Sequence, residues 1–281
     1  MDQHKNAYTN FKDIVQIRLC SPELYNSYKI FDGNKFPRLE TYANGCAYNL
    51  HLIEYSLNIL DLEIDRDKAE CIEELHKQQS SFAGFDPNNK NNMNPVRLLT
   101  YTSPRFFAAF GLFIITIKSL LDVYAILLSR SISIKSELDG FSIPKKCKNI
   151  TGFHKSGNKA DGNVGGKFIN FLKCNSPQTY LQKEQMISCF ECHIEEWICD
   201  IVSIRDELVH NGAISGFIPI RVPLLKKPNE IQKTDILLPC ILINGEELDL
   251  ITYCHEVWQN INRMLKETLE LFPKINEESR H

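Results

Sequence analysis

The stretch that decides the fold runs from Leu181 to His210 and reads LQKEQMISCFECHIEEWICDIVSIRDELVH. Its apolar residues recur at steps of three and four, which places them along one face of an α-helix. Gly212 follows closely and is typical of the residue that ends a helix. We therefore expect one long helix whose apolar stripe is buried against other helices. That stripe consists of Ile187, Phe190, Ile194, Trp197, Ile198, Ile201 and Ile204.

Three more segments carry a helical period of apolar residues. The first covers about 41–80. The second opens at Ser103-Pro104, where serine suits the N-cap and proline suits the first helical position. It continues to about Ser131 and is apolar nearly all round, so we expect it at the centre of the fold. The last covers about 246–272, and long helices with short connections are typical of an antiparallel bundle.

Two runs before the last helix have β character. They cover 214–225 and 235–243, and the polar segment between them predicts a hairpin. Pro219, Pro223 and Pro239 restrict these strands to short or edge positions. The predicted fold class is therefore mainly α, an antiparallel helical bundle with a small β-hairpin inserted before the last helix.

The same patterns predict the domain organisation. Residues 1–40 show no sustained period, and we expect them to form an N-terminal extension packed on the main body, which covers 41–272. Residues 140–167 are rich in glycine and lysine and form a long loop, a length typical of functional or mobile segments. Residues 273–281 form a tail.

The composition is that of a globular protein: 281 residues, 43% hydrophobic and 24% charged, with a net charge of -3. This balance excludes binding of nucleic acid through overall charge, so such binding requires a local patch. The amino-terminal segment lacks an apolar run and the cysteines are scattered, which predicts free thiols in a reducing cytoplasm. The apolar run 106–117, FFAAFGLFIITI, falls short of the ~20 residues of a membrane span, so we expect a core helix and no membrane.

The sharpest functional signal is Arg205-Asp-Glu-Leu-Val-His210, at the end of the predicted long helix. Asp206 and His210 are four apart and share a helix face, so Asp206 can accept a hydrogen bond from His210 and orient it. The carboxyl end of a helix also favours a positively charged imidazole by ~0.3–1 kcal/mol. Both features suit His210 to proton transfer near neutral pH. Arg205 is five residues from His210 and points elsewhere.

This motif resembles that of the HEPN superfamily of α-helical domains, in which an arginine, a polar residue and a histidine follow in the same order. Asp206 fills the polar position, and the resemblance extends in architecture over about 41–272. It implies a homodimer that pools two copies of the motif in one cleft. It also implies that Arg205 binds a phosphate while His210 assists attack by a ribose 2′-hydroxyl, with no metal and no cofactor. The products would be a 2′,3′-cyclic phosphate and a 5′-hydroxyl.

The resemblance therefore implies a cytoplasmic endoribonuclease of the kind found in toxin–antitoxin, phage-defence and RNA-processing systems. Its expected partners are RNA, a second copy of the chain, and an antitoxin or defence-system protein. The alternative is a non-catalytic HEPN-like module that dimerises or binds a partner or a nucleotide. Basic residues around the long loop are candidates for contacting RNA. They are Lys145, Lys146, Lys148, Lys155, Lys159 and Lys167.

Lys118 and Asp122 are charges within the apolar body of the second predicted helix. They are four apart, and a charge in such a helix is costly without a partner, so we expect an ion pair that supports the structure. A sharper hypothesis has Asp122 reaching Arg205 and fixing it.

Cys189-Phe-Glu-Cys192-His193 matches the C-x-x-C-H pattern of c-type haem attachment. Together with Cys199, these residues also offer zinc binding or a redox pair. Zinc sites usually draw ligands from two separated elements, and the sequence holds no second C-x-x-C. Thiols unrelated to function are the favoured interpretation, and no metal site is expected here.

Overall fold

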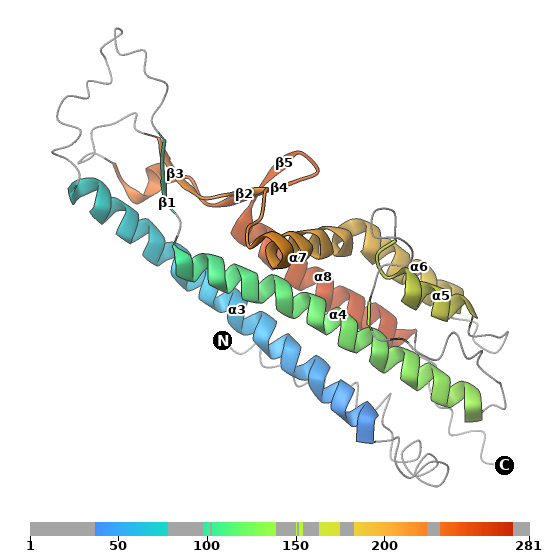
Figure 1. The fold of residues 1–281 in the computed structure, drawn as a ribbon. Helices are drawn as coiled ribbons and strands as arrows, with labels where there is room; N and C mark the ends of the chain where they lie inside the picture. The colour runs from blue at the N-terminus through green and yellow to red at the C-terminus, as the bar shows by residue number, and fades with distance from the viewer. Residues whose placement is uncertain are drawn as a thin grey trace. The chain divides into compact units, whose positions relative to one another are not determined.

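The computed structural model describes residues 37–77, 98–101, 103–138, 150, 152–153, 163–174, 183–223 and 231–271. These residues form a mainly α-helical fold with small antiparallel sheets, shown in Figure 1. The predicted fold class is confirmed, since a helical bundle carries a small antiparallel β element before its last helix. Almost all of the predicted extension 1–40, most of the 140–167 loop and the tail 273–281 lie outside the described residues.

The long helices lie close to where the sequence predicts them. α3 spans Pro37–Lys77, α4 spans Pro104–Leu138 and α8 spans Leu250–Glu270. The predicted helix over 181–210 is α6, Lys183–His193, which continues through a π-helical turn, Ile194–Ile198, into α7, Cys199–Asn211. A shorter helix, α5, spans Gly166–Cys174.

Two helix ends are set by the residues that the sequence indicates. Ser103 Oγ accepts hydrogen bonds from the backbone nitrogens of Arg105 and Phe106, at 3.2 and 3.3 Å, and so caps α4. Gly212 adopts a φ of 66°, and its N–H donates to the carbonyl oxygen of Leu208 at 3.0 Å, which ends α7. The serine cap and the glycine stop are both confirmed.

Internal contacts divide the chain into two compact units. The first unit takes in the described residues within 37–53, 114–205 and 258–271, and within it α4 runs in the opposite chain direction to α3 (Figure 1). The two helices approach closely at Gly45, where an added Cβ would lie 3.2 Å from Val123. Tyr124 of α4 hydrogen-bonds Thr268 of α8 at 2.6 Å. An aromatic cluster packs beside α5 and α6, formed by Phe153, Phe168, Phe171 and Phe190.

The second unit takes in the described residues within 54–113 and 206–257, and it holds the strands that the structure describes. Phe217 packs on Phe107 and Phe110 of α4, with ring centroids 5.5 and 6.5 Å apart, which fixes its strand against the helix. The strands are β1 (Leu98–Tyr101), β2 (Phe217–Ile218), β3 (Ile220–Pro223), β4 (Cys240–Ile243) and β5 (Glu246–Asp249). They pair as β1-β3 and as β2-β4-β5, all antiparallel. The β2–β4 pair joins the two predicted β runs.

The structure corrects the predicted start of the last helix. Glu246–Asp249 is strand β5, which pairs with β4, and α8 begins only at Leu250. The reason is the turn Asn244-Gly245, in which both residues have positive φ, 53° and 87°. An Asn-Gly pair of this kind folds a strand back on its neighbour. The sequence patterns also do not predict β1 or α5.

α4 occupies the predicted core position. The part from Pro104 to Ser133 is long and apolar enough to cross a membrane by length and composition. However, 67% of its most apolar stretch of 18 residues is buried inside the structure. Phe110, Phe113 and Ile117 are each fully buried. A core helix packed by other helices accounts for this apolar sequence.

Candidate functional site

The Arg205–His210 motif lies in the last turns of α7. Arg205 and Asp206 are partly exposed, and His210 is exposed. The helix ends one residue later, at Asn211, and Gly212 turns the chain away. His210 therefore lies at the exposed carboxyl end of a helix, the position that the sequence predicts.

Two residues in the middle of the motif hold this helix end in place. Glu207 accepts hydrogen bonds from the backbone nitrogen and the hydroxyl of Ser215, at 2.8 and 2.9 Å. Leu208 packs on Gly111 of α4, where an added Cβ would lie 3.3 Å from its side chain. Glu207 and Leu208 therefore anchor the turn that carries His210.

The structure describes one of the lysines that are candidates for contacting RNA. Lys167 is exposed in the first turn of α5, directly after Gly165 and Gly166. A basic side chain there is accessible, but its role in RNA binding stays a prediction. The other candidates lie outside the described residues: Lys145, Lys146, Lys148, Lys155 and Lys159.

The predicted ion pair between Lys118 and Asp122 is confirmed. Lys118 Nζ lies 2.5 Å from Asp122 Oδ1, and the lysine side chain is only 10% exposed. The same oxygen accepts a hydrogen bond from the backbone nitrogen of Phe153 at 2.6 Å. Asp122 therefore ties the backbone of Phe153 to α4. Its proposed reach to Arg205 stays a prediction.

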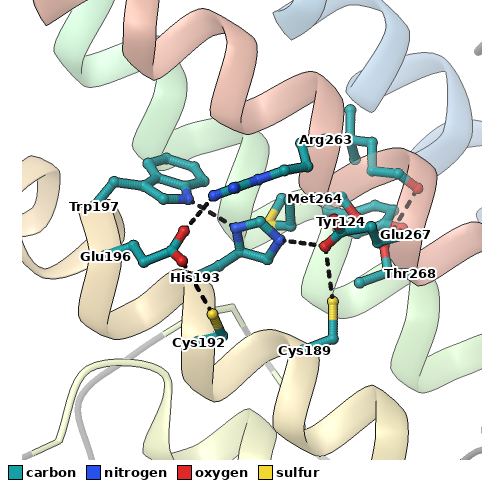
Figure 2. Close-up of polar contacts among 11 residues, drawn as sticks. Tyr124, Cys189, Cys192, His193, Glu196, Trp197, Arg263, Met264, Glu267 and Thr268 are labelled. Carbon is teal, nitrogen blue, oxygen red and sulfur yellow. Dashed lines mark hydrogen bonds and ion pairs between the residues drawn. The ribbon is translucent and has the colours of Figure 1, made fainter.

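A second group of side chains, which includes thiols, an imidazole and carboxylates, forms polar contacts between α6 and α8, as Figure 2 shows. His193 Nε2 lies 2.9 Å from Glu267 Oε2, and Cys189 Sγ donates a hydrogen bond to the same oxygen at 3.5 Å. Cys189 and His193 are four apart on α6 and so face α8 together. We call Cys189, His193 and Glu267 the Cys-His-Glu cluster. Its three ligand atoms all lie within 4.8 Å of one another, which is close enough to hold a metal ion.

The π-helical turn fixes the proton on His193. Trp197 Nε1 donates a hydrogen bond to His193 Nδ1 at 3.1 Å. An indole nitrogen can only donate, so Nδ1 accepts, and the ring proton sits on Nε2, from which His193 donates to Glu267. The His193 side chain is only 2% exposed and both ring nitrogens are hydrogen-bonded, so its orientation is fixed.

The cysteines of the C-x-x-C-H pattern have different surroundings. Burial is the main cause that raises the pKa of Cys189, to about 12, and the Glu267 carboxylate raises it further. Cys192 is exposed and donates a hydrogen bond to Glu196 at 3.1 Å, which raises the pKa of its thiol. Glu196 also pairs with Arg263 of α8. Neither thiol is therefore activated as a nucleophile.

Glu267 is the residue of this cluster that the sequence reasoning missed. It lies more than 70 residues beyond His193, and a glutamate on the face of an amphipathic helix is not distinctive. The signal that was present is the C-x-x-C-H pattern, which marked two of the three members. Cys192 and Cys199, which the sequence offers as further ligands, are not part of the cluster.

Comparisons with models of protein families, with curated proteins and with solved structures found no match to this chain. The resemblance to the HEPN superfamily therefore rests on the motif and on its setting at the end of a bundle helix.

Proposed function

We propose that this chain is a metal-independent endoribonuclease of the HEPN type, acting as a cytoplasmic homodimer in a toxin, phage-defence or RNA-processing role. The observation that carries the proposal is the placement of Arg205 and His210 in the last turns of α7, with His210 exposed. A cation for the phosphate and an imidazole for the proton are the two groups that this cleavage requires. Asp206, one turn before His210, orients the imidazole.

Helix geometry explains why two copies of the chain take part. At about 100° per residue, side chains five positions apart point about 140° away from each other around a helix. Arg205 and His210 of one chain therefore do not grip the same phosphate, whereas the arginine of one copy and the histidine of another can. Val209, next to His210, is 49% exposed and offers an apolar contact for that second copy.

In the proposed reaction, His210 accepts the proton of a ribose 2′-hydroxyl while the 2′-oxygen attacks the adjacent phosphorus. The bond to the 5′-oxygen of the next nucleotide breaks, and this oxygen takes up a proton from water and leaves as a hydroxyl, while His210 returns its proton to solvent. Arg205 donates paired hydrogen bonds to the non-bridging oxygens, whose negative charge grows in the transition state. The phosphate stays behind as a 2′,3′-cyclic ester.

Alanine substitutions test the roles of the two residues. Arg205→Ala and His210→Ala should each slow cleavage of single-stranded RNA by at least about 100-fold. The matched controls are Arg130→Ala and His76→Ala, which remove an exposed arginine from α4 and an exposed histidine from the last turn of α3. Equal cleavage by wild type and both motif variants contradicts the proposal. A dimer that leaves RNA intact would instead favour the non-catalytic module.

Mixing the two inactive variants tests the shared cleft. Heterodimers of Arg205→Ala and His210→Ala still hold one intact arginine and one intact histidine, on different chains. We expect the mixture to recover part of the activity that each variant lacks alone, and light scattering to show a dimer. A monomeric protein that cleaves RNA would contradict the shared cleft.

A further inference from the structure

We propose that Cys189, His193 and Glu267 form a zinc-binding site, separate from the proposed RNA-cleaving motif. Their ligand atoms Sγ, Nε2 and a carboxylate oxygen all lie within 4.8 Å of one another. Thiolate, imidazole and carboxylate are the side-chain ligands that proteins use for zinc. Two ligands come from one face of α6 and the third comes from α8, so two separated elements supply the site (Figure 2).

The cluster is shaped for three protein ligands and one water. The imidazole of His193 is 2% exposed and held from both sides, which fixes the direction of Nε2. Cys189 is half-buried, and the side chain of Glu267 is 47% exposed. The outer side of the cluster is therefore accessible to solvent. Three protein ligands with an open fourth position are a known arrangement for zinc.

The electrostatics of the cluster favour a cation. The Glu267 carboxylate lies next to both other ligands, and its negative charge opposes ionisation of the Cys189 thiol. A divalent cation bound between them would reverse this effect, because it stabilises the thiolate directly. Since zinc must displace the thiol proton, its apparent affinity should rise with pH.

Zinc binding rearranges the protons of the network in a defined way. Zinc needs the Nε2 lone pair of His193, so the ring loses its proton at Nε2 and takes one up at Nδ1. Cys189 loses its thiol proton to solvent, and the net result is one proton released per zinc. Trp197 Nε1 and His193 Nδ1 are 3.1 Å apart in the metal-free structure. With zinc bound, both nitrogens would carry a hydrogen, so two donors would face each other. The indole must move, so its fluorescence should report binding.

A competition titration tests the site on the full chain. Chelator-stripped protein is titrated with zinc against a chromogenic chelator, and tryptophan fluorescence is followed in parallel. We expect one zinc per chain, and Cys189→Ala and Glu267→Gln should each weaken binding by at least about 100-fold. Cys192→Ala is the matched control, because Cys192 belongs to the same C-x-x-C-H pattern but bonds Glu196 instead.

Trp197→Phe supplies an opposite expectation. It should bind zinc about fivefold more tightly than wild type, since no indole hydrogen bond has to be broken.

No stoichiometric binding by wild type, unchanged binding in Cys189→Ala, or loss of binding in Cys192→Ala would each overturn the assignment. RNA cleavage in excess chelator should persist in wild type and in these variants, so failure of the zinc site and failure of the proposed nuclease are distinguishable.

Discussion

Trp197 donates a hydrogen bond from its indole nitrogen to Nδ1 of His193, and this contact decides which tautomer the histidine adopts. The ring then donates from Nε2 to Glu267 of α8. Trp197 lies in the π-helical turn and His193 in α6, so the turn brings the donor to the ring. π-Helical turns inside α-helices are frequent at functional sites. Here the turn links the helix that carries the motif to the Cys-His-Glu cluster.

Trp197→Phe should destabilise the metal-free protein by about 1 kcal/mol, because it leaves the buried Nδ1 without its donor. Urea denaturation measures the change, and Trp258→Phe is the comparison for loss of an indole elsewhere. Nitrogen NMR of wild type should show His193 with its proton on Nε2. A proton on Nδ1 in the metal-free protein would refute the tautomer.

Asp122→Ala should destabilise the protein by about 3 kcal/mol. The substitution leaves the buried Lys118 ammonium without its partner and removes the acceptor for the Phe153 N–H. Lys118→Met is the matched comparison, since it removes the charge and keeps the volume, and we expect a loss of about 1 kcal/mol or less. Urea denaturation of both variants is the measurement, and equal losses would speak against a buried ion pair.

Gly165→Ala should be more destabilising than Gly212→Ala. Both glycines have positive φ, 68° and 66°, which costs an alanine about 1–2 kcal/mol at either position. At Gly212 an added Cβ would meet nothing within 4 Å, whereas at Gly165 it would lie 2.4 Å from the ring of Phe153. Because that ring is packed in the aromatic cluster, the clash should add about 1–3 kcal/mol to the loss of stability in Gly165→Ala. Thermal unfolding compares the two variants, and equal Tm values would contradict the close contact.

Asp67→Asn should change how stability depends on pH. Burial is the main cause that raises the pKa of Asp67, helped by Glu63 and Glu70. A raised pKa in the folded state means stability that is present in acid and lost as pH rises through that pKa. Wild type should therefore lose stability relative to Asp67→Asn as the pH rises from about 4, the ordinary pKa of an aspartate, towards neutrality. Parallel curves from urea denaturation across this range would contradict the prediction.

The positions of the long helices follow from the sequence because each has its own apolar period and its own end signals. Ser103 and Gly212 set boundaries through local hydrogen bonds, which residue type alone predicts. β1 could not be predicted in this way, since its partner β3 lies more than 100 residues away. The predicted start of the last helix is too early by a few residues, and the cause is local. The turn residues Asn244-Gly245 in the sequence indicate a hairpin at this point.

The candidate sites likewise divide into one that local sequence patterns predict and one that depends on contacts between distant segments. The Arg205–His210 motif lies where its helical period places it, because one helix contains all of it. The Cys-His-Glu cluster needs Glu267 from α8, and the spacing of Cys189 and His193 does not encode that residue. Local patterns therefore identified two of the three side chains, and only packing between helices revealed the third.

Cleavage of RNA by Arg205 and His210 without a metal ion is tested most directly by the chemistry of the product ends. Wild-type protein is incubated with single-stranded RNA in excess EDTA, and the fragments are analysed by mass spectrometry. We predict fragments with 2′,3′-cyclic phosphate and 5′-hydroxyl ends. Intact RNA in EDTA, or fragments with 3′-hydroxyl and 5′-phosphate ends, would contradict the proposed function.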